Sequence, residues 1–336
     1  MNVSSAPTPE RILALSHGFW ATQIVSTAAD CRFFTLIAEG HRTAEAVAEA
    51  AGTDLRGTRM ILDALVALDL LFRRNSHYVL AQDAEAFLVE GQPQSLAAYI
   101  AGHPTLLWDD WGRLRETVRS GRRAQDVGDA ARAQAFFPKL IQMIMPLGLG
   151  AADAAASHFG VGRQLTGVRV LDVGAGGAAW SIPFARLDGA SEITALDRPD
   201  VLKHTGEMTA RFGVGERYRL QPGDYRRDDF GEDEYDFVLF GNICHGESPE
   251  VNRTLFAKTH RALKPGGRAL IGDMLRHDDR TGPPMPAMFA LNMYLHNDGD
   301  TYSLADYREW LTGSGFADVS TLDTGRSASP IVVGTK

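Results

Sequence analysis

Apolar residues recur at helical spacing through the first hundred residues of the chain. The pattern begins with Ile12, Leu15 and Phe19 and continues to about residue 101, without the two-residue alternation that is typical of strands. This region is therefore expected to consist mainly of helices that each bury one face.

The middle of this region has the outline of a winged helix. Residues 43–51 and 55–68 predict two short helices, and residues 70–80 predict a small hairpin that turns at 74–76. Two helices followed by such a hairpin indicate a winged-helix-like N-terminal domain, which we expect to span residues 1–101.

A second helical stretch follows, and the pattern then changes. Helical spacing covers residues 108–121 and 133–159, with a polar interval between them, so residues 102–160 are expected to form a helical linker. From residue 161 to 336 short apolar runs alternate with helical ones. The runs that predict strands are 169–173, 192–197, 216–221, 235–241, 267–273, 316–323 and 329–334.

Helices are expected between these strands. The clearest are 249–263 and 304–311, and the second can begin with a capping box made by Ser303 and Asp306. Alternating strands and helices predict an α/β domain built on a mainly parallel sheet.

Composition narrows the class of protein. The chain has 336 residues, 44% of them hydrophobic and 23% charged, and a net charge of −8. The chain start lacks a basic segment followed by an apolar run, and no stretch is apolar enough to span a membrane, so a cytoplasmic protein without a membrane partner is expected. Cys31 and Cys244 stand alone, which predicts neither a disulfide framework nor a metal site.

A glycine-rich turn directly follows the strand expected at 169–173. Gly174 and Gly176 permit a tight turn and a close approach of a ligand to the backbone at the start of a helix, which suits a nucleotide-type cofactor. Asp197 ends the next predicted strand, where its carboxylate can accept hydrogen bonds from ribose hydroxyls. The same three residues would also fit a nicotinamide dehydrogenase.

Two further signals have no role in a dehydrogenase. Asp224 and Tyr225 follow the third predicted strand, where the carboxylate can accept from an adenine amino group and the ring can pack on the base. The segment 263–267, LKPGG, follows the helix expected at 249–263.

The order of these motifs resembles that of the class I S-adenosylmethionine-dependent methyltransferases. More narrowly, the chain is similar over nearly its full length to the small-molecule O-methyltransferases typified by the caffeate and hydroxyindole enzymes and by bacterial natural-product tailoring enzymes. The motifs that carry the resemblance are DVGAGGAAW at 172–180, ALDRPDV at 195–201, GDY at 223–225, NICH at 242–245 and LKPGG at 263–267.

The resemblance implies a Rossmann-like seven-stranded methyltransferase sheet whose last strand is antiparallel. It also implies S-adenosyl-L-methionine as cofactor, a homodimer formed through the N-terminal domain, and a pocket for a small, planar aromatic acceptor that residues 102–160 help to cover. The residues it assigns to the cofactor are Asp172, Gly174, Gly176, Asp197, Arg198, Asp224, Tyr225 and Asn242. Those it assigns to the acceptor are Trp108, Met143, Met288, Asn292, His296 and Asn297.

His245 aligns with the general base of that family. Histidine can take a proton from a phenol near neutral pH, which makes the oxygen a better nucleophile. The family commonly flanks this histidine with two glutamates, and the matching positions here hold Asp273 and Thr301. Asp273 can orient the imidazole, whereas Thr301 has no carboxylate and only neighbouring Asp300 could supply one. Directly after the histidine, where the family often has an acidic residue, stands Gly246, with Glu247 one position later.

These departures leave other chemistry open beside methylation of a hydroxyl. Methylation of a ring carbon, or a decarboxylase, hydroxylase or pericyclase that uses the same cofactor, would suit the same fold. A winged-helix DNA-binding regulator is disfavoured, because residues 1–100 contain seven Arg and no Lys against eleven Asp or Glu, a net charge of −4. No nucleic acid is therefore expected as a partner.

Overall fold

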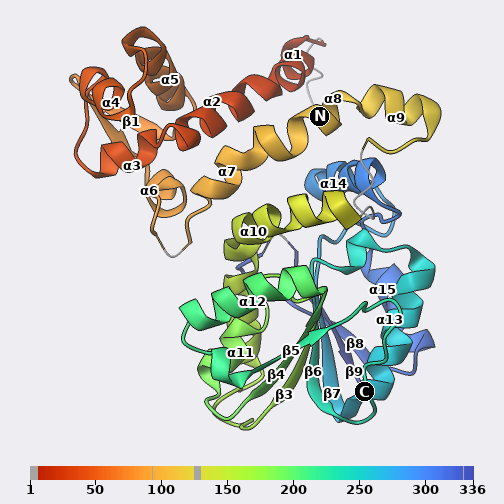
Figure 1. Cartoon of the computed structure of the whole chain (residues 1–336). Helices are drawn as coiled ribbons and strands as arrows, with labels where there is room; N and C mark the ends of the chain where they lie inside the picture. The colour runs from red at the N-terminus through yellow and green to blue at the C-terminus, as the bar shows by residue number, and fades with distance from the viewer. Residues whose placement is uncertain (1–6, 93, 125–129, 328) are drawn as a thin grey trace, which may run out of the picture. The chain divides into compact units, whose positions relative to one another are not determined.

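The computed structural model describes residues 7–92, 94–124, 130–327 and 329–336 (Figure 1). The chain forms two compact units, Met1–Asp109 and Asp110–Lys336, so the segment predicted as a linker, 102–160, is shared between them. Within the described residues, no helix has both the length and the apolar character that a membrane span requires.

The first unit is mostly helical, as the spacing of apolar residues predicted. Its helices are α1 (Glu10–Ser16), α2 (Gly18–Asp30), α3 (Phe33–Ala38), α4 (Ala44–Ala51), α5 (Leu55–Ala67), α6 (Gln82–Leu88) and α7 (Ala97–His103). Strands β1 (Leu71–Arg74) and β2 (His77–Leu80) form the predicted hairpin, with Leu71 paired to Leu80. The helix–helix–hairpin outline is confirmed.

Capping chemistry explains where the two central helices begin. The Thr43 side chain accepts a hydrogen bond from the Ala46 N–H at the start of α4, and Asp54 accepts from Gly57 at the start of α5. Gly52 between them adopts the left-handed conformation that ends α4. The core that these helices share with the hairpin includes fully buried Phe34, Val47, Leu62, Leu65 and Leu71.

The second unit is built on a seven-stranded sheet in the order β5-β4-β3-β6-β7-β9-β8. The strands are β3 (Arg169–Val173), β4 (Glu192–Asp197), β5 (Tyr218–Pro222), β6 (Tyr235–Gly241), β7 (Leu263–Gly272), β8 (Asp318–Leu322) and β9 (Ile331–Thr335). From β5 to β7 all pairings are parallel, and β9 runs antiparallel to both of its neighbours. The predicted sheet with an antiparallel last strand is confirmed.

Helices cover both faces of this sheet (Figure 1). The long helix α10 (Ala130–His158) and α11 (Ile182–Leu187) share one apolar cluster with the sheet, and α13 (Pro249–Ala262) and α15 (Leu304–Gly313) share the cluster on the opposite face. The remaining helices are α8 (Asp109–Gly112), α9 (Leu114–Ser120), α12 (Pro199–Arg211) and α14 (Pro284–His296).

Most of the expected strands and helices of this unit are observed with ends shifted by a few residues, and the start of β7 differs most among the strands. Strand β7 starts at Leu263 and not at 267, because Leu263 pairs with Tyr235 and the pairing resumes only at Arg268 with Phe237. The LKPGG segment is therefore an irregularity inside the strand, where Gly266 takes a φ of +77°.

The single helix expected over 108–121 is also broken. A π-helical turn at Pro104–Trp108 leads into α8, and α9 starts only at Leu114. The Arg113 N–H donates to the Asp110 carbonyl at 3.0 Å, which closes the chain more tightly than an α-helix and separates the two short helices.

The capping box at the start of α15 forms as predicted. Ser303 Oγ accepts from the Asp306 N–H, and the Asp306 carboxylate accepts from the Ser303 N–H at 2.8 Å. The box fixes the start of α15, which carries Tyr307, whose hydroxyl donates to Asp273.

Replacing this cap should destabilise the domain. We expect Ser303→Ala to lower the free energy of unfolding by about 1 kcal/mol, the usual cost of losing an N-cap. Urea unfolding followed by circular dichroism measures it. Thr254→Ala is the matched control, because its hydroxyl only donates back along α13 on an exposed face and should change stability by less than about 0.5 kcal/mol. An equal decrease in the free energy of unfolding in both variants would show that the cap does not stabilise the domain.

Candidate active site

The turn after β3 is the centre of the predicted cofactor site. Gly174 and Gly176 take φ values of +64° and +54°, a conformation that favours glycine. A Cβ on Gly174 would stand 2.4 Å from Ile243 Cδ1, so a side chain there would displace the end of the Ile243 side chain. The turn therefore requires glycine for its conformation and for the close approach of its neighbours.

Asp197 lies at the end of β4, beside this turn. Its carboxylate accepts from the Gly176 N–H at 2.9 Å and from the Arg198 N–H at 2.7 Å. Burial raises the pKa of Asp197, partly offset by these two backbone donors. Each carboxylate oxygen keeps a further lone pair, so the group can also accept from the hydroxyls of a ribose. The Arg198 guanidinium is directed to Asp200, with Nη2 2.6 Å from its carboxylate.

Asp172 lies beneath the turn and is 2% exposed. Ser181 Oγ donates to its carboxylate at 2.5 Å, and the Tyr218 hydroxyl donates to Ser181 Oγ at 2.9 Å. Burial, together with the nearby charge of Asp197, raises the pKa of Asp172 to about 7. Because it is buried beneath the turn, Asp172 is better placed to support the turn than to contact a cofactor directly.

The other predicted cofactor residues follow β5 and β6. The side chain of Asp224 is about half exposed and accepts from the Arg226 N–H at 3.0 Å. Tyr225 reaches back to the glycine turn, where its ring carbon Cε1 lies 3.5 Å from the position of a Cβ on Gly174. Asn242 takes a φ of +60° and donates its N–H to the Gly272 carbonyl at 2.9 Å. The carboxyl ends of β3 to β6 thus bring this set to one edge of the sheet.

His245 lies next to this set, in a 3-10 turn formed by Cys244–Gly246. Its Nδ1 makes a short hydrogen bond to Oδ1 of Asp273, and its backbone N–H donates to Oδ2 of the same carboxylate at 2.8 Å. The Tyr307 hydroxyl and the Met274 N–H also donate to Asp273, at 3.0 and 2.7 Å. Both oxygens of this buried carboxylate are therefore fixed.

This arrangement defines the tautomer of His245. Because the carboxylate of Asp273 accepts, Nδ1 carries the proton and Nε2 keeps a lone pair. Nε2 makes no hydrogen bond to any described residue, and the Phe289 ring makes a T-shaped contact with the imidazole, with centroids 4.9 Å apart. The ring is held in one orientation with a basic nitrogen available.

Asp300, which could have supplied a second carboxylate in place of Thr301, does not bind His245. Thr301 Oγ1 donates to the Pro286 carbonyl at 3.0 Å, and Asp300 accepts from Arg276 at 2.8 Å. Of the acidic positions considered, only Asp273 binds His245.

The polar acceptor-site candidates on and after α14 already have partners within the second unit. Asn292 Oδ1 accepts from Trp111 Nε1 at 3.1 Å. His296 uses both ring nitrogens, Nδ1 with the Asn292 carbonyl at 2.7 Å and Nε2 with Asp110 at 2.9 Å. Asn297 accepts from the Gly299 N–H at 2.9 Å. His296 therefore ties α14 to α8, which leaves it no nitrogen for a ligand.

The apolar candidates are more accessible. Met288 on α14 is 50% exposed, and Met143 on α10 is half-buried. Trp108 belongs to the first unit, is 40% exposed, and packs near Phe19 with ring centroids 6.3 Å apart.

One acidic residue at the site was not assigned a role from the sequence. Glu247 is buried and accepts from the Tyr225 hydroxyl at 2.7 Å and from Arg226. The sequence showed only that Glu247 is an acidic residue two positions after His245. The order of residues in the chain does not reveal that its side chain contacts the loop after β5.

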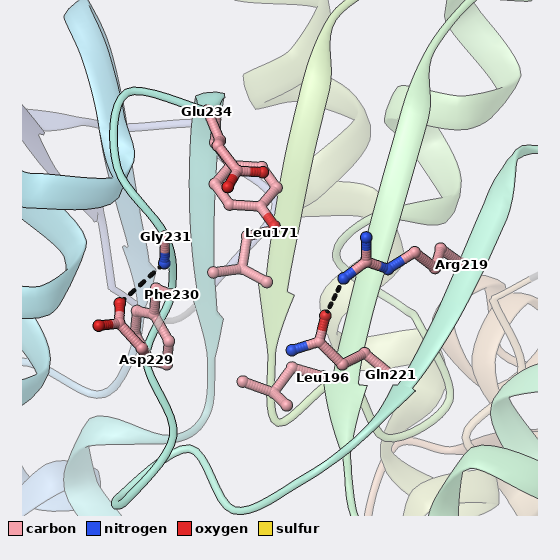
Figure 2. A pocket seen from close by; sticks show the side chains of 9 residues that line it. Leu171, Leu196, Arg219, Gln221, Asp229, Phe230, Gly231 and Glu234 are labelled. Carbon is pink, nitrogen blue, oxygen red and sulfur yellow. Dashed lines mark hydrogen bonds between the residues drawn. The ribbon is translucent and has the colours of Figure 1, made fainter.

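A cavity of about 150 Å³ lies elsewhere on the sheet (Figure 2). Leu171, Leu196 and Phe230 line it together with Arg219 and Gln221 on β5, whose side chains bond to each other. It includes none of the predicted cofactor residues. Among the described residues, no group of three His, Cys, Asp or Glu side chains is arranged to hold a metal ion.

Comparison with known proteins gives consistent matches over both units. Residues 161–317 match the model of an O-methyltransferase domain, and residues 13–90 match that of an O-methyltransferase dimerisation domain. The chain is 30% identical to 3-hydroxy-5-methyl-1-naphthoate 3-O-methyltransferase of Streptomyces sahachiroi, over 98% of this chain and 95% of that protein.

Two further matches extend this result. The tetracenomycin polyketide synthesis 8-O-methyl transferase TcmO of Streptomyces glaucescens is 29% identical over 93% of each chain. The crystal structure of human N-acetylserotonin methyltransferase in complex with SAM is 23% identical, with a TM-score of 0.84 over 100% of this chain and 99% of that one. The last match supports the fold alone.

The buried Asp172 should make stability depend on pH. Its pKa is higher in the folded chain, about 7, than the ordinary 3.8, so the folded state binds the proton more tightly. The stabilisation is complete below pH 3.8 and is lost as the pH rises to about 7, at up to about 1.4 kcal/mol per pH unit.

Asp172→Asn removes this titration and keeps an oxygen that can accept from Ser181. The free energy of unfolding of the wild type minus that of the variant should therefore fall as pH rises from about 5 to 7 and then level off. Urea unfolding of both proteins over this range measures it. A difference that does not change with pH would mean that Asp172 titrates alike in the folded and unfolded chains.

Proposed function

The chain belongs to the O-methyltransferase family, and from that premise we propose that it methylates a hydroxyl of a small aromatic natural product with His245 as general base. S-adenosyl-L-methionine is the methyl donor. The observation that carries the proposal is the His245–Asp273 pair, which leaves the lone pair of His245 Nε2 without a partner among the described residues, two positions after Ile243, which approaches the glycine turn of β3. In this proposal residues 1–101 dimerise, 102–160 help to cover the acceptor, and 161–336 hold the cofactor.

The residues at the carboxyl edge of the sheet fit the donor. The glycine turn lets a ligand approach the backbone, and Asp197 can accept from the two ribose hydroxyls without losing its backbone donors. Asp224 exposes its carboxylate, and the Tyr225 ring, which lies beside the glycine turn, can pack on an adenine. When bound, the donor supplies a methyl group that its sulfonium charge has already activated.

The chain's own residues then have two tasks. The first is to hold the acceptor oxygen in line with the methyl carbon, since positioning contributes a large share of the rate of such a displacement. The second is to remove the hydroxyl proton. His245 Nε2 takes it, and Asp273 stabilises the imidazolium that forms while keeping the ring in place.

An aromatic acceptor is supported by the relatives and by the side chains available. The two bacterial relatives are named for a naphthoate and for a tetracenomycin polyketide, both as O-methyltransferases. Met143 and Met288 supply flexible apolar surface that adapts to a planar ring. These names favour a hydroxyl over a ring carbon and over chemistry without methyl transfer.

A homodimer is the second part of the proposal. Helix α1 has no buried residue, and the apolar side chains of Ile12, Leu15, Phe19 and Trp20 are all at least half exposed. This surface overlaps residues 13–90, which match the dimerisation domain. The overlap supports a second copy of the chain as the partner that covers this apolar surface. The net charge of −4 in residues 1–100 disfavours nucleic acid there.

The base assignment is tested by His245→Ala. With a hydroxylated aromatic identified by an acceptor screen, kcat should fall by roughly 100- to 10,000-fold because the proton then has no acceptor. The Kd for S-adenosylhomocysteine, measured by calorimetry, should change less than about threefold, since His245 is not assigned to the cofactor.

Asp197→Ala is the contrasting control. It should weaken S-adenosylhomocysteine binding by roughly tenfold or more, because hydrogen bonds from the ribose to a carboxylate are lost. A loss of kcat below about tenfold in the His245 variant would assign the base to another group.

The dimer surface is tested by Leu15→Asp. The substitution places a charge at a position that is 73% exposed in the single chain. Since a twofold interface repeats each contact, we expect the dimer dissociation constant to rise roughly 100-fold or more. Sedimentation velocity measures it. Val118→Asp, which alters an equally apolar side chain that is 61% exposed on α9, should leave the dimer intact; an unaffected Leu15→Asp dimer would exclude α1 from the interface.

A further inference from the structure

The proposed mechanism leaves one buried carboxylate at the site without a role. The Glu247 side chain is 4% exposed and lies two residues after His245. Three donors converge on it: the Tyr225 hydroxyl at 2.7 Å, Arg226 Nε at 2.9 Å and Arg226 Nη2 at 2.8 Å. A buried carboxylate is costly unless it is paired and hydrogen-bonded, so these donors must stay in place for Glu247 to remain buried and charged.

All three donors come from the loop that follows β5. This loop contains Asp224 and Tyr225, which the proposed function assigns to the adenosyl group. The Tyr225 ring lies against the glycine turn, with Cε1 3.5 Å from the position of a Cβ on Gly174. A shift of Tyr225 would therefore alter the space beside that turn.

The same loop is tied to α13 by a second cation. Lys258 Nζ donates to the Tyr225 carbonyl at 2.5 Å and to the Asp228 carbonyl at 2.8 Å. Lys258 holds the backbone of the loop, whereas Glu247 holds the side chains of Tyr225 and Arg226. The two contacts act on different parts of the loop, because Lys258 bonds to backbone carbonyls and Glu247 to the hydroxyl of the Tyr225 ring.

Glu247 has neither of the roles that an acid beside His245 would first suggest. Its carboxylate makes no bond to the imidazole, which is oriented by Asp273. Both of its oxygens accept from Arg226, so it is poorly suited to accept a proton from an acceptor hydroxyl.

We propose that Glu247 is a positioning residue for the cofactor. Through the Tyr225 hydroxyl and the Arg226 guanidinium it fixes the loop after β5 against the glycine turn. Because Glu247 follows directly on the turn that carries His245, it also links the cofactor loop to the base. The inference rests on the proposed function, since it takes Tyr225 as part of the S-adenosylmethionine site.

The test is calorimetric titration with S-adenosylhomocysteine, which needs no acceptor. Glu247→Gln keeps the shape of the side chain but can no longer accept from Tyr225 and both Arg226 groups at once. We expect it to weaken binding roughly tenfold. In a Tyr225→Phe background, which lacks the hydroxyl but keeps the Arg226 contacts, the same substitution should weaken binding by clearly less than in the wild type, because the effects of interacting residues do not add.

The matched control breaks another Glu–Arg pair of the same unit. Glu309 and Arg253 are 3.1 Å apart but 67% and 47% exposed, and they lie on α15 and α13 away from the loop. Glu309→Gln should leave the dissociation constant unchanged. Wild-type affinity in Glu247→Gln, or full additivity with Tyr225→Phe, would overturn the proposal.

A purely structural role for Glu247 gives a different pattern. It would lower the melting temperature and leave the affinity of the folded fraction unchanged, which also overturns the proposal. If Glu247→Gln does not fold, Arg226→Gln tests the same pair from its 53% exposed side and should weaken binding by roughly threefold to tenfold. Failure of the wild type to bind S-adenosylhomocysteine would instead refute the proposed function itself.

Discussion

The parallel pairing of β3 with both β4 and β6 is the constraint on which the candidate site depends. Parallel strands end at the same edge of a sheet, so the residues after Val173, Asp197 and Gly241 meet although they are far apart in the chain. This pairing brings together the glycine turn after β3, Asp197 at the end of β4 and the turn that carries His245. Asp273 follows the next parallel strand, β7, which places its carboxylate against His245.

Three buried carboxylates at this edge show how hydrogen-bond donors decide the state of a buried acid. Burying an unpaired carboxylate costs several kcal/mol, so each must find donors or keep its proton. Asp273 accepts from four groups and Glu247 from three, including a guanidinium. Asp172 accepts from Ser181, and burial together with the charge of Asp197 raises its pKa to about 7.

Sequence patterns predicted the parts of the site that follow from local rules. A buried strand appears in the sequence as a run of apolar residues, and a tight turn after it requires glycine. The ends of such strands, and the glycines or acids that follow them, can therefore be recognised from the sequence. The capping box of α15 was visible for the same reason, since Ser303 and Asp306 are three residues apart. The start of β7 was missed because the pairing of Leu263 with Tyr235 depends on a neighbouring strand. Glu247 was missed as a functional residue because its partners lie about 20 positions earlier, in a loop that only the fold brings to it.

Two buried His–Asp pairs in the second unit show why residue type alone does not identify a base. His245 and His296 each contact an aspartate, Asp273 and Asp110, and the sequence assigned both histidines to the active site. His296 Nδ1 faces a carbonyl, which can only accept, so that nitrogen must carry a proton, and Nε2 is occupied by Asp110. His245 gives only Nδ1 to its aspartate and keeps the lone pair of Nε2. The same pair of residues therefore anchors a helix in one place and prepares a proton acceptor in the other, and the difference lies in the second nitrogen.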